Sequence, residues 1–105
     1  MRVITWNLGG AFQALESEKQ KKAWEYLMDL KPDIALVQEA MVPDRVRDSC
    51  FVVWKPAHEG KRWGTAVVSR YPVLEEIDMR MAGAELGETF ERMRDRVIGA
   101  RLDVG

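Results

Sequence analysis

The sequence predicts an α/β fold that opens with a strand–helix–strand unit. Residues 2–8 (RVITWNL) are rich in β-branched and aromatic residues and are followed by two glycines, which is typical of a strand. Apolar residues then recur at helical spacing up to position 30. The run 34–37 (IALV) is continuously apolar, as in a strand that is buried on both faces of a parallel sheet. This order indicates a βαβ unit with a right-handed crossover.

The helix is expected to begin at Ser17 and to end near Leu30 or Lys31. Ser17 and Gln20 have the spacing of a capping box, in which the serine accepts from the backbone near residue 20 and the glutamine side chain reaches back. Pro32 disfavours helical dihedral angles in the residue before it, so the helix should stop there. The residues expected to face water are Lys19, Gln20, Lys22 and Glu25.

The second half of the chain is expected to contain mainly antiparallel strands. The connection 56–64 is polar and contains two glycines, which is typical of a hairpin. Residues 81–95 are expected to form a loop or a short helical turn, because glycines interrupt their helical spacing. Asp44 and Asp48 fall in a connection with no predicted element. The predicted strands are 51–55, 65–69, 73–79 and 97–104.

Length and composition restrict the class of protein. The 105 residues allow one domain at most, and 47% hydrophobic with 31% charged residues is typical of a globular chain. A net charge of −1 disfavours a protein that grips nucleic acid by charge alone. The single cysteine, Cys50, excludes an internal disulfide and a cysteine-based zinc site. Neither a signal-peptide pattern nor an apolar run near the ~18 residues of a membrane span is present, so a soluble cytoplasmic protein is expected.

Two polar residues follow the two strands of the predicted βαβ unit. Asn7 comes at the end of the first strand and Glu39 at the end of the second. Ligands of open α/β sheets bind beyond the carboxyl ends of the strands. An amide oxygen and a carboxylate are hard donors that suit Mg²⁺, which takes few protein carboxylates. The alternatives are that Asn7 only makes a turn and that Glu39 is only solvated.

Four segments in order resemble the endonuclease/exonuclease/phosphatase superfamily, which has the DNase I-like fold. The segments are residues 4–8 (ITWNL), 31–39 (KPDIALVQE), 64–73 (GTAVVSRYPV) and, more weakly, 96–104 (RVIGARLDV). Members typically have a strand ending in W-N, a P-D-[IV]-[IVL]-x-[LV]-Q-E strand and a G-x-A-[IV]-[LV]-S-[RK]-x-P-[IV] segment. The resemblance implies that residues 1–105 form the N-terminal half of a four-layer DNase I-like α/β sandwich, as a single and incomplete domain.

The resemblance also implies roles for individual residues. Glu39 becomes the principal carboxylate for a Mg²⁺ or Mn²⁺ ion, and Asn7 helps to hold the metal or to orient the phosphate. Gln38 would help to position the site, with a solvated amide as the alternative. Arg70 would approach the substrate phosphate, but a structural salt bridge is the favoured interpretation of this residue.

The implied function is a divalent-metal-dependent phosphoesterase, a nuclease or phosphatase that hydrolyses phosphodiester or phosphomonoester bonds. Its substrate would be a phosphate ester, with nucleic acid among the alternatives. The family's strand-end histidine, Asp-x-Asn and Ser-Asp-His are absent from the sequence, and the single histidine, His58, is expected in an exposed loop or beside substrate. No catalytic residue is therefore identified, and these 105 residues are expected to be inactive alone.

The last predicted strand, 97–104, would leave an exposed sheet edge and an uncovered apolar face. We expect a second chain or further residues of the same gene to complete the sandwich. A catalytically inactive scaffold or interaction module that retains the half-fold is the alternative function.

Overall fold

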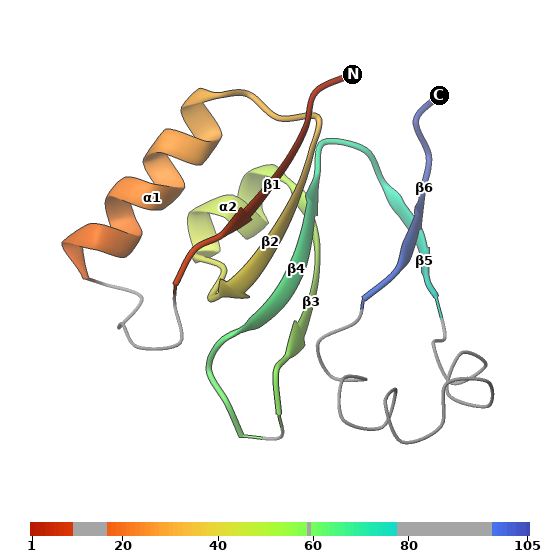
Figure 1. Ribbon diagram of the computed structural model, residues 1–105. Coiled ribbons are helices and arrows are strands. Elements are labelled where there is room, and N and C mark those ends of the chain that lie inside the picture. Colours follow the sequence, from red (N-terminus) through yellow and green to blue (C-terminus); the bar gives the residue numbers. More distant parts are fainter. Residues whose placement is uncertain (10–16, 59, 78–97) are drawn as a thin grey trace.

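A mixed sheet of four strands carries both helices on one face and a separate two-stranded sheet on the other side (Figure 1). The computed structural model describes residues 1–9, 17–58, 60–77 and 98–105. The described elements, in chain order, are β1 (Val3–Asn7), α1 (Glu18–Asp29), β2 (Ile34–Ala40), α2 (Asp44–Ser49), β3 (Phe51–Pro56), β4 (Gly64–Ser69), β5 (Val73–Glu76) and β6 (Ala100–Leu102). The loop or helical turn predicted for 81–95 lies outside the described residues. The result is a small mixed α/β domain.

The four-stranded sheet has the order β1-β2-β4-β3. β1 and β2 are parallel and joined through α1, so the predicted βαβ unit is confirmed. β4 is antiparallel to both β2 and β3, and β3 and β4 form the predicted hairpin. β5 and β6 pair antiparallel in the second sheet and are shorter than predicted within the described residues.

The core lies between the sheet and the two helices. Trp24 and Leu27 of α1 are fully buried there, together with Val46 of α2. Alternate residues of the central strands meet them, since the side chains of a strand alternate between its two faces. These strand residues are Ala35, Val37, Ala66 and Val68. On the opposite face Leu36 remains 39% exposed, so the prediction that residues 34–37 are buried on both faces is wrong for Leu36.

The beginning of α1 confirms one part of the sequence prediction and corrects another. The Ser17 hydroxyl accepts from the Gln20 backbone N–H at 3.2 Å, as an N-cap should. Gln20 was expected to face water, but it is 1% exposed. Its position four residues before Trp24 and seven before Leu27 on the helix accounts for this, because residues at i, i+4 and i+7 share one face. Gln20 therefore belongs to the buried face.

The end of α1 is set by its capping conformation. Leu30 is the C-cap, and Lys31 follows in the left-handed region with φ 50°. The Lys31 N–H donates to the Met28 carbonyl at 3.0 Å, which satisfies one of the carbonyls left open at a helix end. Pro32 then prevents continuation, so the helix ends where the sequence predicted.

Helix α2 was not predicted, because residues 44–49 were assigned to a connection without regular structure. The helix has six residues and buries only Val46, so it has no repeating apolar pattern. Pro43 precedes it at the N-cap, where the missing N–H of proline costs no helical hydrogen bond. Asp44 and Asp48 thus lie on a short helix that covers the core.

Candidate metal site

Asn7 and Glu39 lie at the same edge of the four-stranded sheet. Asn7 is the last residue of β1 and pairs with Gln38 of the parallel strand β2, so Glu39 is one position beyond this pair. The Leu8 N–H donates to the Gln38 carbonyl at 2.9 Å and continues the pairing past Asn7. The two carboxyl ends of a parallel pair thus bring together an amide and a carboxylate, at the edge where α/β proteins bind ligands.

Glu39 was expected after the strand, but it lies inside β2 in a β-bulge. Between Val37 and Ala40, β2 advances three residues while its partner β4 advances only two, from Ala66 to Gly64. The extra residue is accommodated by a left-handed backbone at Glu39, whose φ is 49°. For a residue with a Cβ this conformation costs about 1–2 kcal/mol. Bulges and such strained residues are frequent beside functional sites.

Asn7 and Glu39 differ in the hydrogen bonds that their side-chain oxygens make. The Asn7 Oδ1 accepts from the Gly9 N–H at 3.0 Å, which makes the turn that was the alternative interpretation of this residue. That oxygen has a second lone pair, and the Asn7 side chain is exposed. The half-buried Glu39 carboxylate makes no hydrogen bond or ion pair with the described part of the chain. Its oxygens therefore have no partner among these residues.

The donor set fits a hard divalent cation only in part. One carboxylate and one amide oxygen are ligands that Mg²⁺ accepts when water and substrate phosphate complete its coordination. Within residues 1–9, 17–58, 60–77 and 98–105, no group of three or more His, Cys, Asp or Glu side chains gathers to hold a metal. The described residues thus offer two candidate ligands, Asn7 and Glu39.

Gln38 joins the two strands immediately before Glu39. Its Nε2 donates to the Thr5 hydroxyl at 3.2 Å and to the Leu36 carbonyl at 3.1 Å. Thr5 lies on β1, so this side chain bridges β1 and β2 on the sheet face opposite the helices. The contacts hold the ends of the parallel pair together near Asn7.

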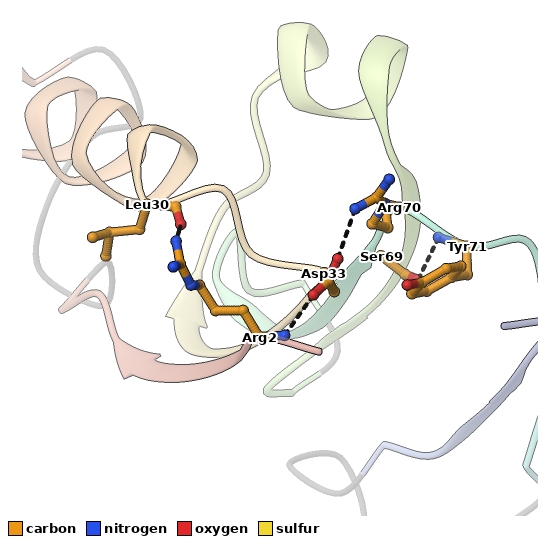
Figure 2. A network of polar contacts seen from close by, with 6 residues as sticks. All are labelled: Arg2, Leu30, Asp33, Ser69, Arg70 and Tyr71. Carbon is orange, nitrogen blue, oxygen red and sulfur yellow. Dashed lines mark hydrogen bonds and ion pairs between the residues drawn. The ribbon is translucent and has the colours of Figure 1, made fainter.

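Arg70 lies at the other end of β2, in the polar network of Figure 2. Its Nη1 is 2.8 Å from Asp33 Oδ1, so the structure contains the salt bridge favoured for this residue. Asp33 Oδ2 accepts from the Arg2 backbone N–H, and the Arg2 guanidinium donates to the Leu30 carbonyl. Asp33 is six residues before Glu39, which is roughly 20 Å along a strand. The network therefore does not include the candidate metal site.

The β3–β4 hairpin ends at the same edge as Glu39, because Gly64 pairs with both Ala40 and Pro56. Figure 1 shows this hairpin extending past the end of β2. His58, Lys61 and Arg62 are exposed on it, and the Lys61 N–H donates to the His58 carbonyl at 3.0 Å. The hairpin thus places two cationic side chains at the edge that carries Asn7 and Glu39.

Two contacts beside the site were not foreseen. Gln20 Nε2 donates to the Leu8 carbonyl at 2.7 Å, and Trp54 Nε1 donates to the Ala40 carbonyl at 2.9 Å. The spacing of Gln20 with the apolar residues of α1 could have indicated its burial, but not its partner. The partner of Trp54 had no signal in the sequence, because it depends on how β3 and β4 pair beside β2.

Comparisons with known proteins do not assign this chain to a family. The sequence matches no protein-family model, and it has no match among curated proteins. Among the described helices, none is long and apolar enough to cross a membrane.

Proposed function

We propose that this chain supplies half of a Mg²⁺- or Mn²⁺-dependent phosphoesterase site, in an N-terminal half-fold of the endonuclease/exonuclease/phosphatase type. The observation that carries the proposal is the Glu39 carboxylate, which has no partner among the described residues, is set on a strained bulge and lies one position beyond the strand partner of Asn7. The mixed four-stranded sheet with its opening βαβ unit supports the fold.

Each residue has a distinct part in the proposed site. Glu39 would bind the cation through its carboxylate, and Asn7 would contribute its amide group to the cation or to a phosphate oxygen. When bound, the metal would act as a Lewis acid on the phosphoryl oxygen. Lys61 and Arg62 on the hairpin would raise the local concentration of an anionic phosphate ester.

The described residues are better suited to binding a cation than to hydrolysing a phosphate ester. Activation of water requires a base within hydrogen-bond reach of the nucleophile. In the described ranges, Glu39 belongs to no group of three or more His, Cys, Asp or Glu side chains. We therefore expect cation binding without measurable turnover from these 105 residues.

A second candidate function is an interaction module that retains the half-fold. It is favoured by apolar side chains on the open face of β1 and β2, where Val3 is 54% and Leu36 is 39% exposed. Such a module has no need of a cation, so cation binding separates the two proposals.

The test is Mn²⁺ binding, followed by electron paramagnetic resonance, in the wild type, Glu39→Gln and Asn7→Ala. Weak binding is expected for one carboxylate, on the order of 1 mM. Glu39→Gln should abolish it and Asn7→Ala should weaken it. Glu76→Gln, an exposed glutamate of β5, is the matched control and should bind as the wild type does.

Two outcomes would contradict this proposal. Absence of Mn²⁺ binding by the wild type would remove the half-site and favour the interaction module. Binding that persists in Glu39→Gln would place the cation elsewhere. Hydrolysis of bis-nitrophenyl phosphate with Mg²⁺, measured in parallel, should stay at background; turnover that Glu39→Gln removes would show that the chain is active by itself.

A further inference from the structure

We infer that Gln20 and Trp54 are positioning residues of the candidate metal site. Each donates a hydrogen bond to the carbonyl of the residue that follows one of the two proposed ligands. Gln20 holds the carbonyl of Leu8, directly after Asn7. Trp54 holds the carbonyl of Ala40, directly after Glu39. This inference rests on the proposed function, because positioning has meaning only if Asn7 and Glu39 bind a ligand.

The Gln20 contact fixes the chain just past Asn7. Gln20 is 1% exposed and its Nε2 is 2.7 Å from the Leu8 carbonyl oxygen. The Leu8 N–H is held by the Gln38 carbonyl at 2.9 Å, so the residue after Asn7 is bound through both its N–H and its C=O. Asn7 forms the last pair of β1 and is followed directly by this anchored residue, which limits the directions open to its side chain.

The Trp54 contact fixes the chain just past the bulge. Trp54 pairs with Ala66 of β4, and Ala66 pairs with Val37 of β2, where the bulge begins. The indole reaches across β4 and donates from Nε1 to the Ala40 carbonyl at 2.9 Å, where the bulge ends. Ala40 is fully buried, so this carbonyl has no access to water as a substitute donor.

Both contacts act on residues whose geometry needs support. A left-handed glutamate persists only when its surroundings determine it, and a ligand set gains affinity when it is held before binding. The two donors come from different elements, α1 and β3, yet each acts on the residue immediately after a proposed ligand. A general role in satisfying buried carbonyls would not place both of them there.

The test measures Mn²⁺ affinity in Trp54→Phe and Gln20→Met, which remove the donating N–H groups and keep most of the side-chain volume. Each should bind about tenfold more weakly, the lower range for loss of a group that orients a metal ligand. Leu27→Ala is the control for lost core packing, since Leu27 is fully buried on α1. At a temperature where circular dichroism shows it folded, it should bind as the wild type does.

A double-mutant cycle excludes a purely structural role. In the Asn7→Ala background, whose weakened Mn²⁺ binding can still be measured, Gln20→Met should cause no further loss, because there is no amide left to position. Trp63→Phe, on the hairpin, controls for removal of a different indole. If Gln20→Met does not fold, the Mn²⁺ affinity of Trp54→Phe still tests the inference.

The outcomes separate the inference from the proposal on which it rests. No Mn²⁺ binding by the wild type would contradict the proposed function. Binding that requires Glu39 but is unchanged in Trp54→Phe would overturn the inference alone. An equal loss in Leu27→Ala would also overturn it, since core packing would then explain the effect.

Discussion

The two ends of strand β2 carry acidic residues in opposite situations. At its start, Asp33 is engaged by the Arg2 backbone N–H and by the Arg70 guanidinium (Figure 2). At its end, the Glu39 carboxylate has no partner in the described part of the chain. The first arrangement is closed, because its charges satisfy one another. In the second, no described residue engages the carboxylate oxygens.

Lys31 and Glu39, the two non-glycine residues with a left-handed backbone in the described part of the chain, repeat this contrast. Lys31, with φ 50°, stands before the Asp33 end and completes the cap of α1, which is the ordinary reason for such a backbone. Glu39, with φ 49°, lies within a strand where no helix end or tight turn requires it. Its backbone instead accommodates the extra residue of the bulge, and bulges with strained residues are frequent beside functional sites.

The largest effect should come from Gly64→Ala, which acts on the Glu39 end. A Cβ at residue 64 would lie 1.9 Å from the Lys55 carbonyl oxygen. Residue 64 and Lys55 lie on paired strands, so the backbone cannot easily move to relieve this clash. We therefore expect a loss of about 3 kcal/mol in the free energy of unfolding, together with loss of Mn²⁺ binding. Urea denaturation measures the first.

Gly60→Ala is the control for that substitution. Its Cβ would have nothing within 4 Å, although its φ of 80° makes alanine unfavourable there. It should cost about 1 kcal/mol and leave Mn²⁺ binding intact. Equal losses in the two variants would show that the close approach at Gly64 is unimportant.

The next effect concerns the charge at the Asp33 end. The Arg2 backbone N–H and the Arg70 guanidinium hold the pKa of Asp33 below its usual value of 3.8. A lowered folded pKa stabilises the protein above the unfolded pKa, and this stabilisation is lost as the pH falls through the folded pKa. Asp33→Asn should therefore lower the melting temperature at pH 7, by a margin that shrinks below about pH 4.

Glu39→Gln completes the comparison of the two carboxylates. Since the Glu39 carboxylate has no partner among the described residues, its neutralisation should leave the melting temperature at pH 7 nearly unchanged. A destabilisation like that of Asp33→Asn would reveal a structural role for Glu39 and weaken the contrast between the two ends.

The smallest effects should come from glycine at the two left-handed positions. Lys31→Gly and Glu39→Gly should each stabilise the fold by about 1 kcal/mol in urea denaturation, because glycine adopts a positive φ without strain. Only Glu39→Gly should abolish Mn²⁺ binding. If Glu39→Gly destabilised the protein instead, the bulge would depend on the glutamate side chain, and strain would not explain its conformation.

Local patterns predicted most of the regular structure. The βαβ unit, the Ser17 cap and the end of α1 follow from neighbouring residues, and each is confirmed. Helix α2 was missed because six residues with one buried side chain have no period to detect. Gln20 was misplaced because a polar residue was assumed to face water, although its spacing put it on the apolar face.

The sequence by itself placed Asn7 and Glu39 near the carboxyl ends of β1 and β2, because apolar strand runs are local patterns. Their juxtaposition followed from the parallel pairing of a βαβ unit. Only the tertiary structure decided that Glu39 sits on a bulge, that Arg70 pairs with Asp33 far from it, and that Gln20 and Trp54 hold the carbonyls beside the site. Each of these depends on contacts between residues distant in the chain, and no short-range pattern encodes which partner such a contact finds.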